Sequence, residues 1–133
     1  MTKVNNASAC FTVEAGKGKY RLTALVAPAG EDLVVSITGG DKPHVGAVAA
    51  AHCAPGVNRK DRLDVSASVI TLPGHKEDEI ARTVAMKLAK EFSVNVAVAA
   101  GMHWDGISKQ GIAAVVENSR LLCEAIILKL KQL

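Results

Sequence analysis

Aromatic side chains are scarce in this sequence. They make up 3% of its 133 residues, whereas hydrophobic residues as a whole make up 49%. A core of this composition is built from Val, Ala, Leu and Ile rather than from rings. Proteins that bind single-stranded nucleic acid stack bases on aromatic side chains, so the composition argues against such a platform.

Long runs of like charge and long apolar runs are missing as well. The formal net charge is +3, but basic and acidic residues alternate and never form a run of five or six. We therefore expect a mild preference for anions and no nucleic-acid partner. No apolar stretch reaches 18 residues without a charge, so no membrane span is expected. Residues 1–8 are polar, lack the apolar core of a secretory signal, and are expected to be flexible.

The cysteines form no recognisable pattern. Cys10, Cys53 and Cys123 are odd in number and widely spaced, unlike a zinc site or a redox pair. We interpret them as reduced thiols of a cytoplasmic protein. Cys123 falls on the apolar face of a predicted helix, where a small core residue fits.

The length predicts a single domain covering residues 1–133. Alternating patterns predict six strands, at Phe11–Ala15, Tyr20–Val26, Leu33–Thr38, Val45–Ala51, Val65–Leu72 and Val94–Ala100. A polar loop is expected over residues 52–64. Helical periodicity begins at Lys76, with Ile80, Val84, Leu88 and Phe92 on one stripe, and a long final helix is marked by apolar residues from Ile112 to Leu130.

This order predicts an α+β two-layer sandwich, with a mostly antiparallel six-stranded sheet and both helices on one face. The first four strands are expected to be joined by tight turns, which makes residues 39–46 a hairpin turn. Because the strands carry Val and Ala on both sides, we expect a homodimer that buries the other face of the sheet.

Two glycine-flanked segments carry most of the polar chemistry: Gly39–Gly46, which contains Asp41 and His44, and Gly101–Gly106, which contains His103 and Asp105. If the sheet brings both to one edge, His44, His103 and Asp105 could bind a divalent metal ion. A hydrogen-bonding pocket for an anionic ligand, or turn chemistry alone, are the competing interpretations. His52 and His75 are interpreted as a loop residue and a turn residue.

Anion binding is supported by more features than metal binding. The N–H groups of Gly39 and Gly40 could form a concave anion site, to which Lys42 and His44 would add donors. Lys109 lies near the start of the last helix, where free N–H groups favour anions. The spacing matches neither a Walker loop nor a dinucleotide fingerprint.

Small and aromatic residues near these segments have more than one interpretation each. Gly46 and the following alanines allow a ligand, a second subunit or a packed helix to approach closely. Trp104 could stack on a planar ligand or pack in the core. Nucleophilic catalysis is not indicated, because no serine lies in a Gly-x-Ser-x-Gly elbow.

The segment from Gly39 to Ala49, together with Gly101–Ile107 and the following helix with Asn118, resembles the LpdD-like proteins. These accompany UbiD-type decarboxylases and are described as prenylated-flavin chaperones. The resemblance covers most of the chain from Phe11 onward. It implies a proteasome-assembly-chaperone-like fold, a homodimer, and binding of prenylated FMN for delivery to the decarboxylase apoenzyme. The matching positions are the His44 turn and His103 with Asp105.

The leading hypothesis is a non-catalytic carrier of prenylated FMN or FMN. Its expected cofactor-binding residues are Gly39, Gly40, Lys42, His44, Gly46, His103, Trp104, Asp105 and Lys109. One alternative is a small metal-dependent enzyme that uses His44, His103 and Asp105, with Asp41 as general base. Another is an assembly chaperone or decarboxylase accessory subunit that contacts protein only.

Overall fold

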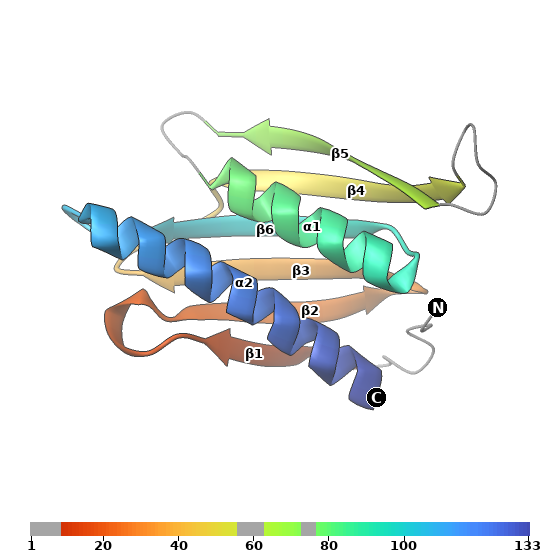
Figure 1. Ribbon diagram of the computed structural model, residues 1–133, viewed down its shortest axis with the longest axis horizontal. Helices are drawn as coiled ribbons and strands as arrows, with labels where there is room; N and C mark the ends of the chain where they lie inside the picture. Colours follow the sequence, from red (N-terminus) through yellow and green to blue (C-terminus); the bar gives the residue numbers. More distant parts are fainter. Residues whose placement is uncertain (1–8, 56–62, 73–76) are drawn as a thin grey trace.

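A computed structural model describes residues 9–55, 63–72 and 77–133. A six-stranded sheet is covered on one face by two helices, as Figure 1 shows. The strands are β1 (Phe11–Ala15), β2 (Leu22–Ala29), β3 (Asp32–Gly40), β4 (Ala47–Pro55), β5 (Leu63–Thr71) and β6 (Val96–His103). The helices are α1 (Asp78–Phe92) and α2 (Lys109–Gln132), and a short 3-10 turn, η1, spans Gly18–Tyr20.

The predicted fold class is confirmed, with one important difference in topology. The strand order is β1-β2-β3-β6-β4-β5, and β3 and β6 run parallel while the other neighbours are antiparallel. Strand β6 is therefore inserted between β3 and β4. The prediction of a hairpin at residues 39–46 was wrong, because this segment crosses the end of β6 instead. Apolar residues on both faces of β6 suit such a central position.

The β4–β5 hairpin is longer than expected. Residues 52–55, 63 and 64 were assigned to a loop, but Cys53 pairs with Val65 and Pro55 pairs with Leu63. His52 is consequently an exposed strand residue, and its Nδ1 lies 3.0 Å from Oδ1 of Asn95. The remainder of the predicted loop, and the assignment of His75, lie outside the described residues.

The core lies between the sheet and the helices. The expected stripe of α1 is confirmed, since Val84, Leu88 and Phe92 are buried and Ile80 is partly buried. Helix α1 packs on β4, β5 and β6, whereas α2 packs on β1, β2 and α1. Fully buried alanines on the inner face of the sheet allow the helices to approach closely: Ala24, Ala47, Ala49 and Ala100. None of the described helices is long and apolar enough to span a membrane.

The central part of the opposite face of the sheet carries uncharged side chains, while the exposed Glu14 and Asp64 belong to the edge strands β1 and β5. One row across it joins Leu25, Ser36, Ala99 and Val48, and a neighbouring row joins Val34, Ala97 and Ala50. Leu25 and Val34 are about half exposed. The solvated face of an antiparallel sheet is normally polar, so this composition is unusual for an uncovered surface.

Candidate functional site

The two glycine-flanked segments meet at one edge of the sheet, which is the condition for a site that both of them share. Because β3 and β6 are parallel neighbours, their carboxyl ends lie side by side. The Asp41 N–H donates to the His103 carbonyl oxygen at 2.7 Å. The Asp105 N–H donates to Oδ2 of Asp41 at 3.4 Å, and Nζ of Lys42 lies 4.0 Å from Oδ1 of Asp105. These contacts fix the two segments to each other.

His44 connects this edge to the start of α1. Its Nδ1 lies 2.7 Å from the Lys42 carbonyl oxygen, which can only accept, so Nδ1 donates. Its Nε2 lies 3.1 Å from Oε1 of Glu77, a residue that is 8% exposed. The Met102 N–H also points at Oε1 of Glu77, at 3.5 Å. Glu77 thus joins the β3–β4 connection, α1 and β6.

Glu77 was missed by the sequence analysis as a site residue. In the sequence it is one of three successive acids in a predicted first helical turn, where acids are common. Only the insertion of β6 between β3 and β4 brings His44 to it. The pairing of these two residues depends on long-range topology, and no local pattern encodes it.

His103 has a different carboxylate partner. Its Nε2 lies 2.9 Å from Oδ1 of Asp105, and both side chains are substantially exposed. The hydrogen bond from His103, and next the charge of Lys42, lower the pKa of Asp105 below its ordinary value of 3.8. Among the described residues, no group of three or more His, Cys, Asp or Glu side chains could hold a metal ion. The predicted site of His44, His103 and Asp105 is therefore not supported, because each histidine pairs with its own carboxylate.

The glycines of these segments allow neighbouring parts of the chain to approach closely. A Cβ at Gly46 would collide with the Glu77 carboxylate, and one at Gly101 would collide with the His44 carbonyl group. Gly40 has φ +82° and lies against the His103 carbonyl group, while Gly39 lies against Leu22 and Trp104. The Cβ side of Gly39, Gly40 and Gly46 thus faces neighbouring segments of the chain, and anion binding by the N–H groups of Gly39 and Gly40 stays a prediction.

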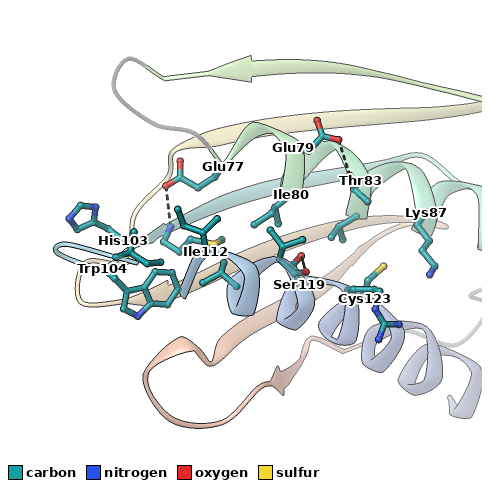
Figure 2. A pocket seen from close by; sticks show the side chains of 16 residues that line it. Glu77, Glu79, Ile80, Thr83, Lys87, His103, Trp104, Ile112, Ser119 and Cys123 are labelled. Carbon is teal, nitrogen blue, oxygen red and sulfur yellow. Dashed lines mark hydrogen bonds between the residues drawn. The ribbon is translucent and has the colours of Figure 1, made fainter. Parts of the chain in front are cut away.

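A cavity of about 640 Å³ opens between the two helices, next to this edge (Figure 2). Helix α1 lines it with Ile80, Val84 and Lys87, and α2 lines it with residues that include Val115 and Val116. Met102, His103 and Trp104 line it from the end of β6. Most of the lining is apolar. Val116 is 56% exposed, so the cavity is open to solvent on this side.

Two contacts hold Trp104 at the end of the cavity next to the sheet edge. Its Nε1–H donates to the Lys19 carbonyl oxygen at 2.5 Å, and its ring meets Tyr20 edge-on, with centroids 5.5 Å apart. It is 8% exposed. The predicted packing role of Trp104 is confirmed, and the ring also lines the cavity, whereas stacking on a ligand stays a prediction.

Lys109 and Cys123 occupy the two remaining positions of interest. Lys109 is the exposed first residue of α2, and the side chain of Ser108 caps this end by accepting from the Gly111 N–H at 3.0 Å. Lys109 is not part of the cavity lining. Cys123 is buried, as predicted, and burial raises the pKa of its thiol to about 11. It lines the far end of the cavity.

Residues 16–131 match the family model of the prenylated flavin chaperone LpdD-like domain. The chain belongs to this family. It is 26% identical over 124 residues to Protein LpdD of Lactiplantibacillus plantarum (strain ATCC BAA-793 / NCIMB 8826 / WCFS1), a match that covers 90% of this chain and 82% of that protein. The resemblance seen in the sequence is thus confirmed.

The fold is shared with a proteasome assembly chaperone. A chain in the crystal structure of a chaperone complex for assembly of the yeast 20S proteasome superposes with a TM-score of 0.59. The match covers 92% of this chain and 98% of that chain, at 12% sequence identity. At this identity the likeness concerns the fold alone, and it confirms the predicted architecture.

Proposed function

We propose that this member of the LpdD-like family is a non-catalytic carrier that holds prenylated FMN, or a related flavin phosphate, in the cavity between α1 and α2. It would deliver this ligand to the apoenzyme of a UbiD-type decarboxylase. The observation that carries the proposal is the mostly apolar cavity of about 640 Å³, bordered by His103 and Trp104. This volume lies within the range of small-molecule and cofactor sites, about 300–1,000 Å³.

The residues present fit a flavin ring. Apolar side chains of both helices, among them Ile80, Val84 and Val115, would exclude water from its faces. Polar and charged residues complete the lining, among them Thr83, Lys87 and Ser119, and such groups set a ligand's orientation. When bound, prenylated FMN would supply the reactive centre of the decarboxylase, and the carrier would only bind and shield it.

The predicted site residues divide into two groups in this proposal. His103 and Trp104 line the cavity and would contact the ligand. His44, Lys42 and Asp105 would act indirectly, because they hold the β6 end and Glu77 in place. A cavity that is open on the side of Val116 suits a protein that releases its ligand to another.

The test is a titration of the purified protein with prenylated FMN and with FMN, followed by ligand fluorescence. We expect Val116→Asp to weaken binding by about tenfold or more, because a carboxylate beside an apolar ring is poorly solvated. Leu128→Asp is the matched control, since Leu128 lies on the same helix, is 61% exposed and is not part of the cavity lining.

Two results would contradict the proposal. Equal losses in the two variants would place the ligand elsewhere, and no retained chromophore in the wild-type protein would remove the carrier function. The second result would favour the protein-only assembly chaperone, a function compatible with the shared fold. The cytoplasmic location inferred from the cysteines stays a prediction.

A further inference from the structure

The orientation of the ligand can be argued from the two ends of the cavity, and this inference rests on the proposed function. At the end near the sheet edge, three backbone donors already have acceptors. The Asp41 N–H donates to His103, the Gly46 N–H to Ala100, and the Gly111 N–H to Ser108. A phosphate bound by these three groups would have to displace those bonds, which disfavours this position.

Charge at that end also disfavours an anion. Three carboxylates gather there, those of Asp41, Glu77 and Asp105. Lys42, which the sequence analysis assigned to an anion, lies within 4.0 Å of Asp105. A phosphate dianion placed there would lie close to these carboxylates, and like charges at close range repel.

Lys87 lies at the opposite end. It is ten residues beyond Glu77 in the sequence, which corresponds to about 15 Å along a helix axis. Figure 2 shows Lys87 beside Cys123, with Glu77, His103 and Trp104 at the other end. The charge of Lys87 acts inside the cavity, because it lowers the pKa of Cys123 against the larger opposite effect of burial.

The carboxylates near Lys87 are matched by other cations. Glu91 is 2.7 Å from Nζ of Lys131, and Glu124 is 2.8 Å from Arg120, which also binds Glu117. Within residues 9–55, 63–72 and 77–133, no carboxylate oxygen lies within 4.0 Å of Nζ of Lys87. Lys87 is thus the cavity-lining lysine whose donors are available to a ligand.

We propose that Lys87 binds the phosphate of the flavin ligand, and that the ring lies at the His103–Trp104 end of the cavity. An elongated ligand, with a planar ring and a polyol phosphate chain, then follows the axis of α1. The ring then lies against the sheet edge at His103 and Trp104, and the phosphate lies at Lys87.

The test compares two probes that share one ring: FMN, which carries the phosphate, and riboflavin, which does not. Wild-type protein should bind FMN about tenfold to a hundredfold more tightly, the contribution of one charge-assisted hydrogen bond. Lys87→Gln should lower FMN affinity to the level of riboflavin and leave riboflavin affinity unchanged. Lys90→Gln, an exposed lysine of α1 outside the cavity lining, is the matched control and should keep the preference.

Other outcomes would overturn this assignment and leave the carrier function intact. One is retention of the FMN preference in Lys87→Gln together with its loss in Lys42→Gln, which would place the phosphate at the sheet edge. Another is equal binding of FMN and riboflavin by the wild-type protein. Binding of neither probe, and of no prenylated FMN, would overturn the orientation and the carrier function together.

Discussion

Each histidine at the edge of the sheet is fixed by a different carboxylate, and this division defines the chemistry of the site. His44 meets the buried Glu77, whereas His103 meets the exposed Asp105. Sequence patterns correctly indicated that His44, His103 and Asp105 lie at one edge, because each follows a strand. The pairing of His44 with Glu77 could not be predicted, since Glu77 lies at the start of a helix that begins more than thirty residues after His44.

The His103–Asp105 pair makes a prediction about pH. The pKa of Asp105 is lower in the folded protein than its ordinary value of 3.8. Its carboxylate therefore contributes stability above pH 3.8, and this contribution is lost as the pH falls through the folded-state pKa. His103→Ala removes the main cause, and the pKa of Asp105 should rise toward 3.8, while Lys42 still holds it slightly below. Carboxyl NMR titration measures this shift.

The control for this titration is His52→Ala. The ring of His52 contacts Asn95 rather than a carboxylate, so this variant should leave the pKa of Asp105 unchanged. An unchanged pKa in His103→Ala would mean that the 2.9 Å contact does not persist in solution.

At the scale of elements, strand β6 decides both the topology and the site. The pattern of apolar residues located β6 and both helices to within a few residues, because such a pattern is a local property of the sequence. The insertion of β6 beside β3 was not predictable, since the apolar residues of β6 indicate a buried strand but do not specify its neighbours. What the sequence does record is the close approach that follows, through the small residues Gly46 and Gly101.

Gly101→Ala tests this close approach. Its Cβ would collide with the His44 carbonyl group and lie 2.9 Å from the Val45 nitrogen, so the β3–β4 connection would have to move. We expect the free energy of unfolding, measured in urea, to fall by about 3 kcal/mol. Ser66→Thr, which adds a methyl group at an exposed position of β5, should change it by less than about 0.5 kcal/mol. Equal small effects would show that Gly101 is not a packing constraint.

At the scale of the whole molecule, the uncharged central rows of the outer sheet face favour the homodimer expected from the sequence. Its central rows contain Leu25, Ser36, Ala99 and Val48, without a charge among them. Two such faces could pack about 10 Å apart, as in a β-sandwich. The dimer remains a prediction, because it depends on a second copy of the chain.

Ala99→Arg should convert the dimer to a monomer in analytical ultracentrifugation, since it would bury two guanidinium groups near the symmetry axis without partners. Ala113→Arg, at an exposed position of α2, adds the same charge and should leave the dimer unchanged. A wild-type protein that sediments as a monomer at micromolar concentration would contradict the prediction.

The parallel pairing of β3 with β6 also has a consequence for how the protein forms. Leu33 pairs with Val96 and Gly40 with His103, contacts that span about sixty residues of chain. The β1–β3 meander and the β4–β5 hairpin involve neighbours in sequence and can form early, whereas β6 enters between them only after α1 has been synthesised. Contacts of such long range slow folding. The cavity needs the end of β6 and the part of α2 from Ile112 to Cys123. We therefore expect it to form late in folding, and a growing chain that lacks this part of α2 would have no complete cavity.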